Sequence, residues 1–218
     1  MPLIPIIPIG NSLTCSFNSE GTLTFPQRVI DLLGWEHNAK IALSYIHEPL
    51  TLLLRSAEIG HPGFTLSHLS HADTGKAGGK ISCTKFSKEV LRSRIVFPLR
   101  GLVPIFLKSS NFQLALTLQS PEWRTVEFSL TGCQKISPEV KGVYQLLSSD
   151  MKVLRIGEGI VQTRTREHLK DQRIVQSTQL VRYISLEDKE ETEIMEKILI
   201  AYHEAEHKHL PEFNSIRA

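Results

Sequence analysis

The N-terminal half of the sequence contains the same order of elements twice, and this repetition limits the folds that the chain can adopt. Residues 21–56 and 79–120 each begin with a short alternating segment, continue with helical spacing and end with two strand-like segments. One such unit cannot bury its apolar face alone, so two copies are expected to pack together. The sequence therefore predicts a β-rich domain with an internal duplication over about 10–56 and 79–120.

The local signals within each copy differ in strength. In the first copy, Val29, Ile30, Leu32 and Leu33 form an apolar helical face, and Gly34 follows as a stop signal. Strands are then expected within 40–46 and 50–55. In the second copy, Val90 and Leu91 take the helical role, and residues 102–110 and 112–119 form a hairpin. The stretch 61–80 is rich in Gly, His and Ser and is expected to be a linker.

Composition indicates the class of protein and the compartment in which it is expected. Hydrophobic residues make up 41% of the chain, charged residues 22%, and the net charge is +2, as in ordinary soluble domains. No window approaches 18 uninterrupted apolar residues, which argues against a transmembrane helix and a membrane partner. The three cysteines, Cys15, Cys83 and Cys133, are widely separated and favour free thiols in the cytoplasm.

The last third of the chain has a different pattern. Gly142-Val143-Tyr144 begins a strand, residues 148–150 form a turn, and residues 152–156 return as a second strand. A helix follows, on which Arg164 and His168 are spaced i, i+4 and therefore share one face. A longer helix is expected over about 186–207, with an acidic first turn.

This last third resembles the GIY-YIG nuclease family. The first motif of the family is matched by Gly142-Val143-Tyr144 and the second by Arg155-Ile156-Gly157, in which Arg155 replaces the second tyrosine. Further matches, in chain order, are the helix residues Arg164 and His168, the metal-binding Glu196, and Asn214 in "LPEFN". The resemblance implies a small α/β domain over 137–218 with a three-stranded antiparallel sheet and flanking helices.

The resemblance also implies a reaction, the hydrolysis of a DNA phosphodiester bond with one divalent ion, Mg²⁺ or Mn²⁺. Glu196 would be the metal ligand, an oxygen donor of the kind that Mg²⁺ prefers. Arg164 would hold a phosphate oxygen, Tyr144 would act as general base with help from His168, and Asn214 would position the phosphate or a water. Arg155 could supply charge stabilisation in place of a hydroxyl, or activity could be reduced.

A second resemblance concerns the N-terminal region. Gly10-Asn11-Ser12-Leu13, followed by Pro26 at the start of a short helix that ends at Gly34, is similar to AbrB/MazE-like swapped-hairpin DNA-binding domains. It implies that residues 1–136 form the DNA-recognition domain. The candidate DNA contacts are Arg28, Lys85, Lys88, Arg92 and Arg94.

A competing motif lies near the C-terminus, where His203-Glu204-Ala205-Glu206-His207 matches the zinc-peptidase pattern H-E-x-x-H. A peptidase needs a further ligand, and only His209 or Glu212 follows closely. We expect this segment to be an exposed helix end instead.

Taken together, these features predict an α+β protein that acts as a sequence-specific endonuclease on double-stranded DNA, similar to type II restriction enzymes. Cutting both strands needs two active sites, so a homo-oligomer, a dimer or tetramer, is expected. The alternatives are a repair or mobile-element nuclease and a non-catalytic DNA-binding regulator, with a zinc peptidase as the weakest.

Overall fold

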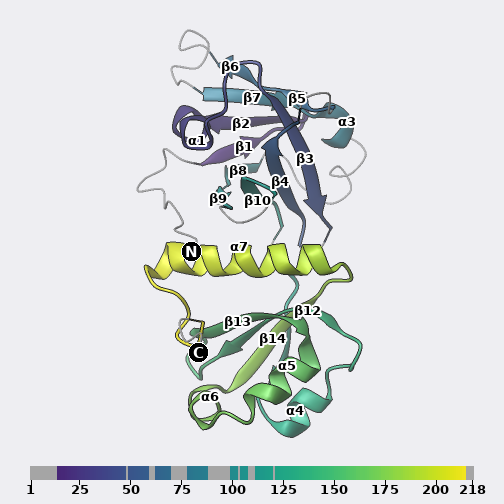
Figure 1. Ribbon diagram of the computed structural model, residues 1–218, viewed down its shortest axis with the longest axis vertical. Helices are drawn as coiled ribbons and strands as arrows, with labels where there is room; N and C mark the ends of the chain where they lie inside the picture. Colours follow the sequence, from purple (N-terminus) through teal and green to yellow (C-terminus); the bar gives the residue numbers. More distant parts are fainter. Residues whose placement is uncertain are drawn as a thin grey trace. The chain divides into compact units, whose positions relative to one another are not determined.

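The computed structural model describes residues 14–47, 49–58, 62–69, 78–87, 99–102, 104–107, 111–119 and 121–214. These residues form a mixed α+β structure with antiparallel sheets, as the sequence predicted (Figure 1). The chain divides into an N-terminal unit, which ends at Ser120, and a C-terminal unit, which begins at Pro121. No helix in the described part of the chain is both long and apolar enough to cross a membrane.

The N-terminal unit contains two five-stranded sheets. The first has the order β6 (Ser67–Leu69), β7 (Gly78–Ser82), β2 (Thr22–Pro26), β1 (Cys15–Phe17) and β8 (Leu99–Leu102). The second has the order β5 (Phe64–Thr65), β3 (Lys40–Ile46), β4 (Thr51–Ser56), β10 (Leu114–Thr117) and β9 (Ile105–Phe106). Their apolar faces share one core that includes Phe17, Phe25 and Leu54.

Several local expectations for this unit are confirmed. Helix α1 (Gln27–Leu33) buries Val29 and Ile30, and Gly34 ends it in the left-handed conformation at φ 64°. Glycine adopts this conformation without the steric cost that a β-carbon brings. Strands β3 and β4 lie where the sequence predicted them, and β9 pairs with β10 as the expected hairpin.

The predicted linker over 61–80 is wrong in part, because it contains β5, β6 and the start of β7. Gly78 and Gly79 belong to β7, which pairs with β2. Glycine is a weak strand former, so its presence suggested a loop. A β-carbon at Gly78 would collide with the backbone carbonyl oxygen of Phe25, which cannot move aside as a side chain can, so a glycine stands in this strand.

The strand orders bear on the duplication. The first sheet joins the copies through β2 and β7, and the second joins them through β4 and β10. Each sheet therefore contains strands from both copies, an order compatible with two packed repeats. The helix expected at Val90 and Leu91 lies outside the described residues, as does Gly10-Asn11-Ser12-Leu13; the short helix α3 (Thr84–Phe86) is described nearby. The duplication itself stays a prediction.

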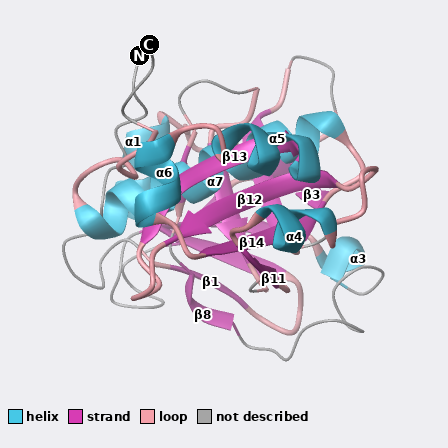
Figure 2. Cartoon of the chain, turned by 90° about the horizontal axis from the view of Figure 1, so that it is seen from below, coloured by secondary structure: helices cyan, strands magenta, loops and turns pink. Residues whose placement is uncertain are grey.

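The C-terminal unit is built on a single sheet of four strands. Its order is β11 (Arg124–Glu127), β14 (Leu180–Ser185), β12 (Lys141–Leu147) and β13 (Val153–Ile160). Its helices are α4 (Leu130–Gln134), α5 (Val161–His168), α6 (Gln172–Ser177) and α7 (Lys189–His207). Figures 1 and 2 show α4, α5 and α6 on one face of this sheet and α7 on the other.

Two expectations for this unit require correction. The sheet has four strands rather than three, because β11 pairs with β14 along its whole length. The boundary accordingly lies at 120/121 and not at 136/137. Phe128, Cys133 and Ile136, assigned from the sequence to the first domain, are buried in the core of the second. Strand β11 ends at Glu127, and Ser129 then caps α4 by accepting a hydrogen bond from the amide of Gly132.

Candidate active site

Tyr144 lies at the centre of the C-terminal sheet. It is in β12, opposite Gly157 in β13 and Tyr183 in β14. Its side chain is fully buried, and its hydroxyl lies 2.7 Å from Nε2 of His168. A β-carbon at position 157 would lie 2.5 Å from Cζ of Tyr144, so only glycine leaves room for the phenol. The pairing of Tyr144 with a glycine thus fixes where the hydroxyl can lie.

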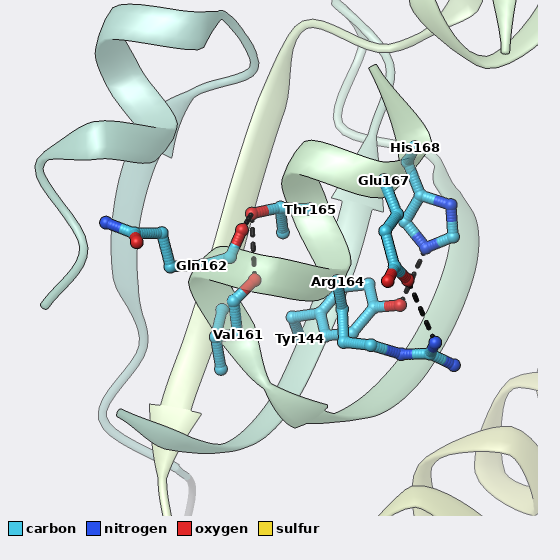
Figure 3. A network of polar contacts seen from close by, with 7 residues as sticks. All are labelled: Tyr144, Val161, Gln162, Arg164, Thr165, Glu167 and His168. Atoms are coloured by element: carbon cyan, nitrogen blue, oxygen red, sulfur yellow. Dashed lines mark hydrogen bonds and ion pairs between the residues drawn. The ribbon is translucent and has the colours of Figure 1, made fainter. Parts of the chain in front are cut away.

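Helix α5 supplies two side chains to the same place. It begins directly after β13, and Thr165 anchors its buried side by donating to the carbonyl of Val161 at 2.8 Å. Arg164 and His168 project from the side that faces Tyr144 (Figure 3). The predicted i, i+4 pair is therefore brought to the hydroxyl of a strand residue, as the sequence-based hypothesis required.

The charges around Tyr144 show which other residues converge there. Burial is the largest effect and raises the pKa of Tyr144; the nearby cations Arg155 and Arg164 lower it, and the carboxylate of Glu196 raises it again. These influences come from β13, α5 and α7, so charged groups on three elements act on one hydroxyl. Without a ligand, the balance keeps the phenol neutral.

His168 is held in its neutral form. Burial and the charges of Arg155 and Arg164 lower the pKa of His168 to about 4, against weaker opposing effects from Glu167 and Asp171. A neutral imidazole carries one free nitrogen lone pair. His168 can therefore accept a hydrogen bond from the Tyr144 hydroxyl at neutral pH.

Arg155 is held between the sheet and the C-terminal segment. Its Nη1 donates to the carbonyl of Phe213, while its Nε is buried and has no hydrogen-bond partner in the described structure. A buried donor without a partner costs free energy, about 1–3 kcal/mol. Donors held in this way are suited to an anion that arrives with a ligand.

Asn214 lies close to the same strand, but its amide is already engaged. Its Nδ2 donates to the carbonyl of Ile156 at 2.7 Å, and its Oδ1 accepts from the amide of Ile156 at 2.7 Å. The side chain thus pairs with β13 as a neighbouring strand would. Its observed role is to hold the C-terminal segment beside Arg155, rather than to offer a free amide to a phosphate.

Arg164 is paired on the surface with Glu167. The Nη1–Oε2 distance is 3.0 Å, and the two side chains are 47% and 49% exposed. Ion pairs this exposed contribute about 0–1 kcal/mol. A phosphate that accepts two hydrogen bonds from Arg164 can therefore replace Glu167 at little cost in free energy.

Glu196 is the residue that could hold a metal. It is half-buried on α7, and its charge reaches Tyr144. In the described part of the chain, no three His, Cys, Asp or Glu side chains are grouped as a complete metal cage. A single carboxylate fits Mg²⁺, which keeps several waters and uses few protein ligands, but it does not fit a structural zinc site.

The candidate DNA contacts are only partly described. Arg28 on α1 and Lys85 on α3 are exposed, as a phosphate contact requires. Lys88, Arg92 and Arg94 lie outside the described residues. Their proposed role stays a prediction.

Sequence reasoning missed two contributors to the site. One is the carbonyl of Phe213, which orients Arg155 and which no side-chain pattern could reveal. The other is the steric role of Gly157: it was part of the motif, but its contact with Tyr144 follows only from the strand register.

Comparison with known proteins gives no relative. No protein-family model matches the chain, and neither does a curated protein or a solved structure. The chemistry of the site has to be inferred from its own residues.

Proposed function

We propose that this protein is a sequence-specific DNA endonuclease that uses one divalent metal ion, similar in action to type II restriction enzymes. The observation that carries the proposal is the convergence of Tyr144, His168, Arg155, Arg164 and Glu196 from four elements. Such a set contains a general base with its own proton acceptor to activate water, two cations to bind a phosphate and one carboxylate to bind a metal. Phosphodiester hydrolysis needs these three components.

The first component is the proton acceptor. Tyr144 takes a proton from the attacking water while its own proton passes to Nε2 of His168, 2.7 Å away. The pKa of about 4 leaves the lone pair of His168 available but makes it a weak base in the free protein, so the transfer depends on the negative charge of a bound phosphate, which raises the pKa of His168. The hydroxyl is buried in the free protein, so the attacking water has to enter together with the substrate.

The second component is the pair of arginines. The planar guanidinium of Arg164 can bind two phosphate oxygens, and Nε of Arg155 supplies a further donor. Both charges favour the transition state, in which negative charge grows on the phosphoryl oxygens. In this proposal Arg155 replaces the second tyrosine of the family motif as an anion-binding group.

The third component is the carboxylate of Glu196, which would hold Mg²⁺ or Mn²⁺. The ion, when bound, supplies neutralisation of the leaving oxygen. The N-terminal unit would read the DNA sequence, with exposed cations such as Arg28 and Lys85 on phosphates. Two copies of the chain would cut the two strands of a symmetric site.

A plasmid-cleavage assay with Mg²⁺ tests the proposal, with Glu196→Gln as the diagnostic variant and Glu193→Gln as its matched control. Both residues are on α7, and Glu193 is engaged with Lys189 at 3.5 Å. We expect discrete fragments from the wild type, at least a hundredfold slower cutting by Glu196→Gln, and wild-type rates from Glu193→Gln. Equal losses in both variants would contradict the role of Glu196.

The assay also separates the alternatives. Random nicking instead of discrete fragments would favour a repair or mobile-element nuclease. Sequence-specific gel shifts without any cutting would favour the regulator, the one alternative that a specific feature supports, namely Arg155 in place of a tyrosine.

A further inference from the structure

Three histidine rings gather where α7 ends. The ring centroids of His203 and His207 are 4.4 Å apart, those of His203 and His209 are 5.7 Å apart, and those of His207 and His209 are 6.1 Å apart. Zinc–nitrogen bonds of about 2.1 Å at tetrahedral angles place neighbouring ring centroids roughly 5 Å apart. The three rings thus have the spacing of imidazoles that share one ion.

The end of the helix produces this grouping. His203 and His207 are one turn apart and share a face of α7. Two further residues of helix would carry His209 to another face. Instead, Lys208 adopts the left-handed conformation at φ 67°, and the chain reverses so that His209 returns beside the other two. Regular helical spacing does not reveal this arrangement.

Two of the rings have nitrogen atoms that are ready for a ligand. His203 is only 5% exposed, and its buried Nε2 has no hydrogen-bond partner in the described structure. His209 lies with Nδ1 2.8 Å from the carbonyl of Leu210. When Nδ1 donates this bond, the lone pair is on Nε2, the arrangement common in metal-binding histidines.

We propose that His203, His207 and His209 bind a transition-metal ion, with Zn²⁺ as the best fit. Among the described residues no three donors already stand at coordination positions, so binding requires side-chain rotation. His203 is fixed by burial, whereas His207 and His209 are exposed and can turn toward it. When His207 turns, it gives up the 3.7 Å approach of its Nε2 to Glu206.

The electrostatics of the cluster agree with this assignment. Burial and the neighbouring His207, His209 and Lys152 lower the pKa of His203 to about 4. His203 is therefore neutral, which is the form that binds metal. A bound ion would fasten the end of α7 to the segment that follows. The inference concerns metal binding alone, and no peptide hydrolysis is part of it.

This site is distinct from the nuclease site in its chemistry. Imidazole nitrogens favour Zn²⁺, Cu²⁺ or Ni²⁺, whereas a lone carboxylate favours Mg²⁺. Excess Mg²⁺ is therefore expected not to displace Zn²⁺ from the histidine site. The inference does not rest on the proposed nuclease function, and either can fail alone.

Titration of the full-length, chelator-treated protein with ZnCl₂ by calorimetry tests the inference, with Co²⁺ absorption as a second readout. We expect one ion per chain, bound at micromolar or lower concentration, and the intense visible bands of tetrahedral Co²⁺. Replacing either exposed ring, His207→Gln or His209→Gln, is expected to weaken binding at least tenfold. The exposed His37→Gln is the matched control and is expected to bind as the wild type does.

Glu196→Gln separates the two sites, because it is expected to lose DNA cleavage and keep zinc. Absence of saturable zinc binding at micromolar concentration would overturn the inference. So would binding that is unchanged in both His207→Gln and His209→Gln. Circular dichroism of each variant identifies any loss that reflects unfolding, since both substituted positions are on the surface.

Discussion

At the scale of single residues, the position of the Tyr144 hydroxyl depends on what position 157 lacks. A β-carbon there would overlap the phenol, and Tyr144 is fully buried and has no room to retreat. We expect Gly157→Ala to lower the free energy of unfolding by about 1–3 kcal/mol, the usual cost of overpacking. Urea denaturation measures this loss, and cleavage by the folded fraction is expected to fall as well. Unchanged stability and cleavage would show that β12 and β13 can separate without cost.

Two buried histidines predict how stability changes with pH. His168 and His203 each have a pKa of about 4 in the folded chain, against an ordinary value of 6.5. Both are neutral in either state above pH 6.5, whereas between pH 6.5 and 4 only the unfolded chain takes up the protons. We therefore expect the free energy of unfolding to fall as the pH is lowered through this window.

Urea titrations at pH 7 and pH 5 measure the effect. His168→Gln is expected to weaken the pH dependence, because it removes one of the two protons taken up on unfolding. His37→Gln, at an exposed position, is the control. An identical pH dependence in the wild type and in His168→Gln would contradict the assignment of a neutral, buried His168.

At the scale of elements, α7 is the helix on which Glu196 depends, and its N-terminus is capped by Asp188. The Asp188 carboxylate accepts a hydrogen bond from the amide of Glu191 at 2.9 Å. Removal of such a cap costs about 1 kcal/mol. We expect Asp188→Ala to destabilise the chain by that amount in urea denaturation. Glu187→Ala removes the same charge from the adjacent exposed position, so an equal loss there would mean that charge and not the cap is responsible.

The helices and strands differ in how well local sequence patterns predicted them. The hairpin of β12 and β13, helix α5 and most of α7 were predicted, because each has a strong local signal: a polar turn, an i, i+4 pair and an acidic first turn. Strands β5 and β6 were missed, because they are short and lie in a stretch rich in Gly, His and Ser. Such strands form only when a neighbouring strand supplies their hydrogen bonds, and no local window contains that neighbour.

At the scale of the whole molecule, the boundary between the units decides which part of the chain can fold alone. Residues 121–136 contribute β11 to the C-terminal sheet and Phe128, Cys133 and Ile136 to its core. Burying a large apolar side chain such as Phe128 or Ile136 contributes about 1.5–3 kcal/mol. We expect the fragment 121–218 to unfold cooperatively in urea. The shorter fragment 137–218 is expected to lack a cooperative transition, because β14 loses β11, one of its two partner strands, and the core loses Phe128, Cys133 and Ile136.

Circular dichroism and hydrogen exchange of the two fragments provide the measurement. Equal stability of both fragments would contradict the boundary at 120/121. Failure of both to fold would show that the C-terminal unit needs residues from the first 120.

The sequence by itself determined the features that depend on neighbouring residues and on the order of motifs along the chain. These are the α+β class, the main helices and strands of the C-terminal unit, and the residue types of the candidate site. Only the tertiary structure decided what depends on contacts between distant segments. Those contacts set the fourth strand, the place of Gly157 beneath Tyr144, the engagement of Asn214 with Ile156 and the return of His209 to His203. The physical reason is that helical and strand periodicity depends on residues close together in the sequence, whereas register, burial and chain reversal depend on the packing of the folded chain.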